Sequence, residues 1–155
     1  TWQSQFGRRA GDRKLFTGRV REGREAVTDF ETLLRGSLSA LVLARPRTGR
    51  THQIRVHLAE NGHPIVGDHM YGRAYPRPGS QPDSEVVALR AITRQALHAW
   101  ALRFLHPSTG KPMELFAPLP RDLREACAAV FGADFQEALP AHPFAVEPPP
   151  RRPAR

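Results

Sequence analysis

Residues 39–61 contain a change of periodicity that constrains the fold more than any other part of the chain. Ser39 to Arg45 form a nearly continuous apolar run, which is typical of a strand buried on both faces. Thr48-Gly49-Arg50 then predicts a turn, and Thr51 is a suitable N-cap for a helix that extends to about Asn61. The chain therefore passes from a strand through a glycine turn into a helix within a short distance.

The remaining patterns favour an α+β fold, in which a mostly antiparallel mixed sheet carries two short helices. In the first helix Ile54 and Leu58 lie one turn apart and are expected to face the core. The alternation of apolar residues and the turn signals between them predict two hairpins. The expected hairpins join 14–21 to 25–34 and 97–105 to 112–116, and the expected helices span 51–61 and 120–131.

One domain is expected, because 155 residues suffice for a single hydrophobic core. Residues 13–133 are assigned to it. Residues 1–12 are predicted to be an irregular N-terminal segment, and residues 73–85 a surface loop because they hold three prolines. Residues 134–155 are predicted to be a disordered tail, since six of the sixteen residues after Leu139 are proline and three are arginine.

The charge of the chain is strongly positive, with a formal net charge of +8 and a pI near 11.1. Nearly all of this excess is arginine, since lysine occurs only at positions 14 and 111. Guanidinium groups bind phosphate through two donors and stack on bases, so a nucleic-acid partner is a reasonable hypothesis. The alternative is that a GC-rich genome simply prefers arginine codons.

Two further features of the composition limit the class of protein. A single cysteine excludes an intrachain disulfide and a cysteine-based metal site. No stretch approaches the roughly 18 consecutive apolar residues that a membrane helix needs. A cytoplasmic protein without a membrane partner is therefore expected.

The densest polar cluster lies at residues 47–57, where a glycine turn leads into a predicted helix N-terminus. Backbone N–H groups and the helix dipole favour an anion at such a position. Arg47, Arg50, His52 and Gln53 add side-chain donors and are the candidate RNA-binding residues. Arg55 follows the inward-facing Ile54, and a guanidinium that is partly buried needs a carboxylate partner. The alternative is that these residues are ordinary solvated charges.

The cluster also belongs to a longer pattern. Arg50-Thr-His-Gln-Ile-Arg-Val-His57, followed by Gly62-His-Pro-Ile-Val-Gly-Asp68 and Tyr71-Gly72, resembles the signature segment of RluA-type RNA pseudouridine synthases. Arg94 with the segment 97–107 is similar to the next block of that family, and Glu114 to Pro120 is similar to its closing block. The resemblance covers roughly residues 17–131.

This resemblance implies part of the pseudouridine synthase catalytic fold and an enzyme that isomerises uridine to pseudouridine in structured RNA. The RNA is expected to be ribosomal or transfer RNA, the complete enzyme is expected to be monomeric, and neither a cofactor nor a metal is expected to be needed. The target base is flipped into a pocket, where an aspartate acts as the nucleophile. Arg55 matches the arginine that pairs with this aspartate. Arg55→Ala is therefore predicted to abolish turnover in the complete enzyme while leaving folding mostly intact.

The sequence departs from the family at the nucleophile. The family places it in an Arg-Leu-Asp segment well upstream of the signature, and no such segment occurs in this chain. None of the six aspartates has the matching context, so Arg55 is expected to pair with an aspartate that is absent from this chain. These aspartates are Asp12, Asp29, Asp68, Asp83, Asp122 and Asp134.

The first residue, Thr1, favours a truncated or divided gene product, and a degenerate gene is also compatible with it. The leading hypothesis is a C-terminal portion of a pseudouridine synthase that is inactive alone. The first alternative is a catalytically inactive remnant that still binds RNA. The second is a fragment that does not fold alone and exposes a strand edge and apolar surface.

Overall fold

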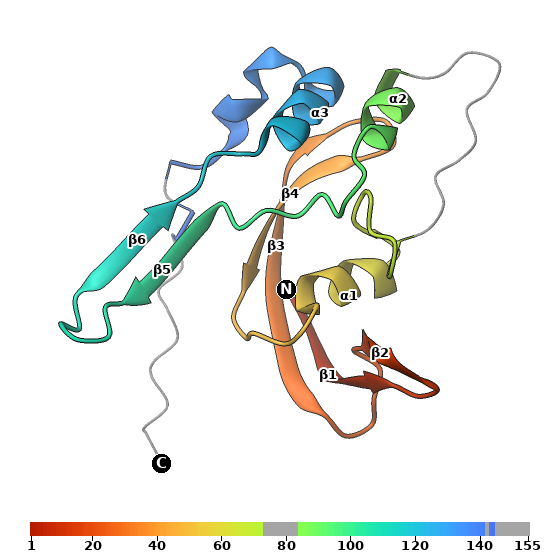
Figure 1. Cartoon of the computed structure of the whole chain (residues 1–155), viewed down its shortest axis with the longest axis vertical. Helices are drawn as coiled ribbons and strands as arrows, with labels where there is room; N and C mark the ends of the chain where they lie inside the picture. Colours follow the sequence, from red (N-terminus) through yellow and green to blue (C-terminus); the bar gives the residue numbers. More distant parts are fainter. Residues whose placement is uncertain (73–83, 142, 145–155) are drawn as a thin grey trace.

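The computed structural model describes residues 1–72, 84–141 and 143–144, and it shows an α+β arrangement (Figure 1). A four-stranded antiparallel sheet has the strand order β2-β1-β3-β4, and a separate hairpin pairs β5 with β6. The expected fold class is thus confirmed. The elements are β1 (Trp2–Arg9), β2 (Asp12–Thr17), β3 (Arg24–Arg35), β4 (Ala40–Pro46), α1 (Gln53–Glu60), α2 (Ser84–Arg90), β5 (Ala101–Leu105), β6 (Pro112–Phe116), α3 (Arg121–Phe131) and the 3₁₀ helix η1 (Ala133–Ala138).

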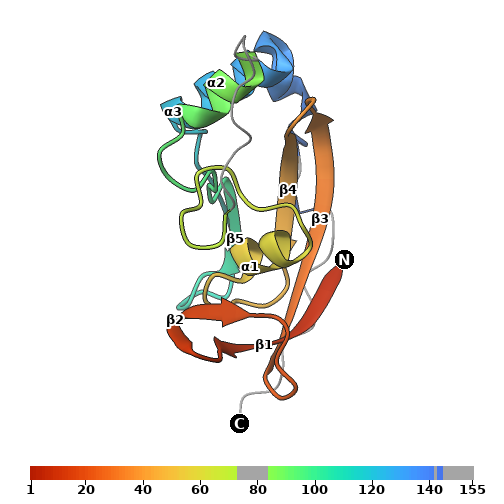
Figure 2. The same ribbon diagram turned by 90° about the vertical axis from the view of Figure 1, so that its right-hand side faces the viewer.

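Helix α1 lies against the four-stranded sheet, as two views at right angles show (Figures 1 and 2). Val56 is fully buried and packs in a cluster with Phe6 and Ala26. The prediction that Ile54 and Leu58 form the inward face was wrong, because Gln53 and His57 are buried beside Val56 instead. The physical reason is hydrogen bonding: the Gln53 and His57 side chains form hydrogen bonds to β3, and these bonds set the rotation of the helix about its axis.

Residues 2–9, predicted to be irregular, form strand β1 in the interior of the sheet. Trp2 and Phe6 point to the packed side while Gln3 and Gln5 are exposed, which is the alternation of a half-buried strand. The Trp2 ring lies 4.5 Å from the Phe30 ring on β3. The strand is not evident from the sequence, because the residues that alternate with Trp2 and Phe6 are polar and the β3 residues that pair with it lie 18 to 26 positions along the chain.

The predicted hairpin between residues 14–21 and 25–34 was also wrong. Strand β2 pairs with β1 around a turn in which Gly11 has a φ of 83°, and β3 pairs with β1 and β4. Gly23 is therefore not a simple hairpin glycine. A Cβ at Gly23 would lie 2.6 Å from the backbone oxygen of Phe6, so this glycine permits close packing of two chain segments.

Strand β4 was expected to be buried on both faces, but it is the edge strand of the described sheet and its residues are exposed or only half-buried. The turn that joins it to β3 is held by helix α2, which the sequence did not predict. The predicted loop 73–85 extends into α2, and residues 73–83 lie outside the described residues. Helix α2 packs on α3 above the sheet (Figure 2).

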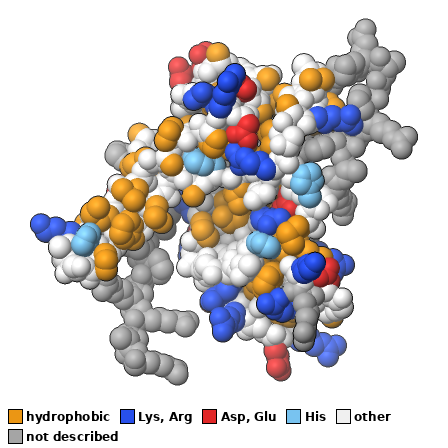
Figure 3. All heavy atoms as spheres, viewed as in Figure 1, with side chains coloured by type: hydrophobic (Ala, Val, Ile, Leu, Met, Phe, Trp, Pro, Cys, Tyr) orange, Lys and Arg blue, Asp and Glu red, His pale blue; other side chains and the backbone are white. Residues whose placement is uncertain are grey.

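The hairpin predicted at residues 97–116 is confirmed as β5 and β6. One of its faces is apolar and open, since Leu102 pairs with Leu115 and Phe104 with Met113 across the strands. These four side chains are 37–56% exposed. Figure 3 shows the hydrophobic side chains gathered over this hairpin.

The C-terminal region begins as predicted with helix α3, preceded by Pro120. The prediction of disorder from residue 134 onward was wrong for its first part, because η1 continues the fold and buries Phe135 to 3% exposure. An aromatic anchor outweighs the polar composition around it. Residues 142 and 145–155 of the predicted tail lie outside the described residues. Within the described ranges, no helix is long and apolar enough to cross a membrane.

Candidate functional site

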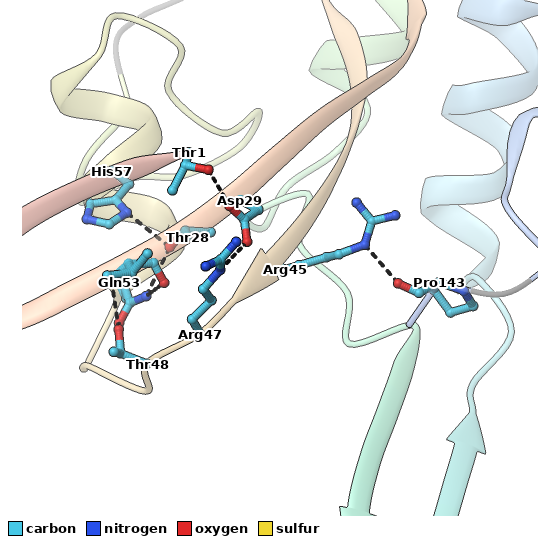
Figure 4. Close-up of polar contacts among 10 residues, drawn as sticks. Thr1, Thr28, Asp29, Arg45, Arg47, Thr48, Gln53, His57 and Pro143 are labelled. Atoms are coloured by element: carbon cyan, nitrogen blue, oxygen red, sulfur yellow. Dashed lines mark hydrogen bonds and ion pairs between the residues drawn. The ribbon is translucent and has the colours of Figure 1, made fainter. Parts of the chain in front are cut away.

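The loop before α1 is fixed to the sheet by the side chain of Gln53, which is only 4% exposed. Its amide oxygen accepts hydrogen bonds from the Arg50 backbone N–H at 3.0 Å and from the Thr48 hydroxyl at 2.7 Å. Its amide nitrogen donates to the Val27 carbonyl oxygen on β3 at 3.0 Å. Figure 4 shows this amide between the loop and the strand. The arrangement sets the position from which Arg50 projects.

Gln53 was a candidate RNA-binding residue, but the structure places its amide among protein partners and gives it a positioning role. Thr51 was the expected N-cap of this helix. The helix instead begins at Gln53, with His52 at the N-cap position in the left-handed region at a φ of 60° and without a capping side-chain bond. Non-glycine residues seldom adopt this conformation, and such strain often occurs at functional sites.

Two other predicted RNA-binding residues, Arg47 and Arg50, reach the surface from opposite ends of the loop. Arg47 Nε donates to the Asp29 carboxylate at 2.6 Å, and its side chain is still 50% exposed (Figure 4). Arg50 Nε donates to the Glu25 carbonyl oxygen at 3.0 Å. Both side chains are therefore anchored on β3, and the Arg47 guanidinium remains accessible to solvent.

Arg55 forms a buried ion pair with Asp68, in which two parallel hydrogen bonds of 2.7 Å join Nε and Nη2 to the two carboxylate oxygens. The side chains are 11% and 1% exposed. Burial acts to raise the pKa of Asp68, but hydrogen bonds from Arg55 and from backbone N–H groups outweigh it, so the pKa lies below its usual value. The hydrogen bonds to Asp68 in turn raise the pKa of Arg55. Both groups are ionised at neutral pH.

Asp68 also shapes the turn in which it lies. Its Oδ1 accepts hydrogen bonds from the backbone N–H groups of Met70 and Tyr71 at 3.0 and 3.1 Å. The preceding Gly67 has a φ of 69°, and a Cβ there would lie 2.1 Å from the Arg94 backbone oxygen. Asp68 therefore shapes its own loop in addition to pairing with Arg55.

An aromatic group connects this ion pair to the β1–β2 hairpin. The Arg55 guanidinium carbon lies 5.0 Å from the centre of the Tyr71 ring, a cation–π distance. The Tyr71 hydroxyl accepts a hydrogen bond from the Phe16 N–H and is 3.0 Å from His52 Nδ1. Burial and the nearby Arg55 charge lower the pKa of His52. The neutral His52 ring therefore serves as a hydrogen-bonding group beside the guanidinium.

His57 occupies a second polar centre beneath the loop, with only 2% exposure. Its Nδ1 lies 3.0 Å from the Thr28 hydroxyl on β3 (Figure 4). Its Nε2 lies 2.9 Å from the Ser4 hydroxyl on β1. The Thr28 hydroxyl also accepts a hydrogen bond from Gln53. Burial lowers the pKa of His57, so the ring is neutral in the folded protein.

The folded chain is expected to lose stability between pH 6.5 and the folded-state pKa of His57. Because this pKa is lowered, the unfolded chain binds more protons in that range, and the free energy of unfolding falls as the pH falls. The slope contributed by one histidine reaches about 1.4 kcal/mol per pH unit. Urea unfolding of wild type and His57→Asn at several pH values measures it. His52 titrates in both proteins, so identical slopes would contradict the prediction.

The geometry thus yields a guanidinium that is oriented by a buried carboxylate and flanked by a tyrosine. The bidentate bond uses Nε and Nη2 of Arg55, and a guanidinium carries five N–H donors in a fixed plane. A further anion or carboxylate would therefore approach through Nη1. This is an arrangement for holding and orienting an anionic group, and sequence reasoning found its arginine but not its Asp68 partner.

The family model described as RNA pseudouridylate synthase matches residues 1–60, which include β1 to β4 and α1. The ribosomal large subunit pseudouridine synthase D of Xanthomonas campestris is 46% identical over 109 residues, covering 70% of this chain and 33% of the relative. The protein of the same name from Escherichia coli is 43% identical over 115 residues, covering 74% and 35%.

Solved structures show the same relationship. Human RNA pseudouridylate synthase domain containing 1 matches with a TM-score of 0.58 and 30% identity, covering 76% of this chain and 47% of the human chain. Human RNA pseudouridylate synthase domain containing 4 matches with a TM-score of 0.56 and 28% identity, covering 81% and 49%. The chain thus spans about a third of the length of these curated relatives and about half of the solved chains.

Proposed function

The chain belongs to the RNA pseudouridylate synthase family, and we propose that its Arg55 site takes part in isomerising uridine to pseudouridine in structured RNA. The ion pair with Asp68 is the observation that carries the proposal. It holds the guanidinium in one orientation at a site where its side chain is only 11% exposed, and a positioned charge acts more strongly on a second charged group as water is excluded.

In this proposal Arg55 holds and keeps ionised the carboxylate of a nucleophilic aspartate supplied from outside these 155 residues. Asp68 orients Arg55 through Nε and Nη2, and the nucleophile approaches Nη1. An adjacent arginine lowers the pKa of a carboxyl group, so the aspartate remains a nucleophile at neutral pH. Arg47 and Arg50 bind backbone phosphates, and His52 supports Tyr71 beside the guanidinium.

Ribosomal RNA is the substrate that we propose, and a cytoplasmic site of action goes with it. The Xanthomonas and Escherichia relatives carry the ribosomal large subunit in their names, and both cover at least 70% of this chain. Transfer RNA is the competing substrate. The two substrates are compared by the tritium that an active enzyme releases from RNA labelled at uracil C5. Equal release from ribosomal and transfer RNA transcripts would contradict this assignment, whereas release from ribosomal transcripts alone would support it.

Tritium release from RNA labelled at uracil C5 tests the activity itself. The chain alone is expected to give no release. A chimera in which it replaces the matching segment of the Escherichia coli relative is expected to release tritium. Arg55→Lys in that chimera retains the charge but loses the planar fork, so activity is expected to fall at least about 100-fold. Arg121→Ala, a change on the exposed surface of α3, is the control and leaves the rate unchanged.

Two results would contradict the proposal. Full activity of the Arg55→Lys chimera would remove Arg55 from the mechanism. Release by the chain alone would place the nucleophile within it, and Asp68 and Asp29 would then be replaced first. An inactive RNA-binding remnant is the second candidate function, and one observation favours it: Arg55 already has a complete bidentate partner in Asp68. RNA binding by an inactive chimera would support that alternative.

A further inference from the structure

A pocket of about 310 Å³ lies beside the Arg55 site, between the β1–β2 hairpin and the loop before α1. Three separate segments form its walls: the hairpin, the residues at the start of β3, and the glycine turn at residues 49–51. Figure 3 shows Lys and Arg side chains gathered over this end of the molecule. The lining residues are Phe6, Gly7, Arg8, Phe16, Gly23, Arg24, Gly49, Arg50 and Thr51.

Three arginines, one from each segment, converge on this pocket. Arg8 comes from β1, Arg24 from the start of β3, and Arg50 from the glycine turn. Among the described residues that line it, none is acidic. Arg50 is anchored through Nε to the Glu25 carbonyl oxygen, which leaves its two Nη groups at the free end of the side chain. Three guanidinium groups in the lining of one pocket favour an anion there.

The pocket also has an aromatic wall, which holds Arg8 in place. Arg8 and Phe16 are cross-strand partners, and the guanidinium carbon lies 5.2 Å from the centre of the Phe16 ring. Phe16 stacks on the buried Phe6 with ring centres 5.9 Å apart and an angle of 14°. An arginine that is already stacked loses less conformational freedom when it binds a ligand than an unconstrained one does.

The dimensions of the pocket depend on its glycines. A Cβ at Gly23 would lie 2.6 Å from the Phe6 oxygen, and a Cβ at Gly7 would lie 3.1 Å from a methyl carbon of Val20. Side chains at these positions would therefore push the walls apart. A Cβ at Gly49 would meet no atom within 4 Å, so this position faces open space. Chain segments thus pack closely at the wall formed by Gly7 and Gly23, whereas the wall at the Gly49 turn is open.

The pocket is connected to the Arg55 site by continuous ring contacts. The Phe16 ring, over which the Arg8 guanidinium lies, is edge-on to the His52 ring at 5.9 Å. The His52 ring is in turn edge-on to the Tyr71 ring at 5.6 Å. Tyr71 in turn contacts Arg55. Two aromatic rings, those of His52 and Tyr71, thus lie between the Phe16 wall of the pocket and the Arg55 guanidinium, and RNA held in the pocket could extend along them toward the proposed reaction site.

We propose that this pocket binds a backbone phosphodiester of the RNA substrate, gripped by Arg8, Arg24 and Arg50, and so sets which nucleotide reaches Arg55. The inference rests on the proposed function, because it identifies the ligand with the RNA strand that carries the target uridine. Arginine suits this ligand, since its planar fork binds two phosphate oxygens at once. Arg8 and Arg24 are thereby added to the RNA-binding residues that the sequence indicated.

Binding of a fluorescently labelled RNA stem-loop to the full chain, measured by anisotropy over a range of salt concentrations, tests this assignment. Arg8→Ala and Arg24→Ala are each expected to weaken binding about tenfold, the effect of losing one charge-assisted hydrogen bond. Each change is also expected to reduce the slope of log Kd against log salt by about 0.7 to 0.9. Arg9→Ala and Arg21→Ala are matched controls, because these exposed neighbours do not line the pocket.

Thermal unfolding of each variant shows whether the fold is intact. Should Arg8→Ala destabilise the hairpin, Arg8→Lys replaces it, because lysine retains the charge and the aliphatic stem but loses the bidentate grip. Weaker RNA binding by Arg8→Lys would then support the proposal, and unchanged binding would overturn it. Equal losses in all four alanine variants would also overturn it, because they would indicate a diffuse charge effect.

Two further outcomes distinguish an RNA phosphodiester site from a site for free phosphate and from the proposed reaction itself. In the first, inorganic phosphate binds tightly and loses affinity when Arg8 is replaced, while the affinity for RNA is unchanged by the same replacement. This result would indicate a site for free phosphate and overturn the inference. Tritium release that persists in a chimera carrying both Arg8→Ala and Arg24→Ala, with unchanged KM, would overturn the pocket but leave the proposed reaction standing. Loss of release with Arg55→Lys alone concerns the reaction and not the pocket.

Discussion

Replacing Arg55 with alanine is expected to lower the free energy of unfolding of this chain by about 3 kcal/mol or more. The substitution leaves the Asp68 carboxylate, only 1% exposed, without its charged partner in the protein interior. The sequence alone suggested that folding would be mostly intact, and the structure changes that expectation. Urea unfolding measures the loss. The exposed pair of Arg121 with Glu125 is the control, since Arg121→Ala is expected to leave the free energy of unfolding nearly unchanged.

A double-mutant cycle with Asp68→Asn tests whether the pair itself is responsible. Because each single change breaks the same interaction, the loss in the double variant is expected to be well below the sum of the two single losses. Additive losses would contradict the assignment.

The pH dependence of the stability that Asp68 contributes has a defined sign. The folded-state pKa of Asp68 is lowered, so its contribution is present above pH 3.8 and is lost as the pH falls through the folded value.

Replacing Glu85 with alanine is expected to cost about 2 to 3 kcal/mol of unfolding free energy, because the carboxylate organises the whole β3–β4 turn. Glu85 is 6% exposed. It accepts hydrogen bonds from the Ser37 and Leu38 backbone N–H groups and from the Ser37 and Ser39 hydroxyls. Unfolding by urea measures the effect. Ser39→Ala removes one of these bonds and is expected to cost about 1 kcal/mol.

Glutamine at position 85 separates charge from shape. Its amide has nearly the same size, but it presents an NH₂ group to donors that need an acceptor, so Glu85→Gln is expected to retain little of the stability. Wild-type stability in this variant would contradict the role of the charge. Burial acts to raise the pKa of Glu85, and the hydroxyl and backbone bonds outweigh it. Its contribution is therefore present above pH 4.5 and is lost as the pH falls through the lower folded pKa.

Both predictions depend on contacts between segments that are distant in the sequence, and this explains what the sequence did not indicate. Glu85 meets the 37–39 turn across more than forty residues, and no local pattern in a proline-rich segment predicts that helix α2 begins there. Strand β1 was missed for the same reason, since Phe6 is recognisable as a core residue only beside Ala26 and Val56.

The site divides in the same way. Arg55 was identified from the segment 50–57, because the motif is short and the resemblance to a family supplied its meaning. The burial of Gln53 was not predicted, because its amide forms hydrogen bonds with Val27 and Thr28 on β3, a strand that is distant in the sequence. The ion pair of Arg55 with Asp68 was not predicted either, because it joins two segments that meet only in the folded chain.

The sequence by itself determined the features that depend on local order: the α+β class, the β5–β6 hairpin, helix α3 and the motif that contains Arg55. Each follows from spacing along the chain, which sets backbone preference and the direction of neighbouring side chains. Only the tertiary structure decided which strands pair, which face of α1 is buried, and that Arg8, Arg24 and Arg50 share one pocket. The physical reason is that burial and ion pairing depend on which segments meet in space, and the sheet order β2-β1-β3-β4 sets these meetings.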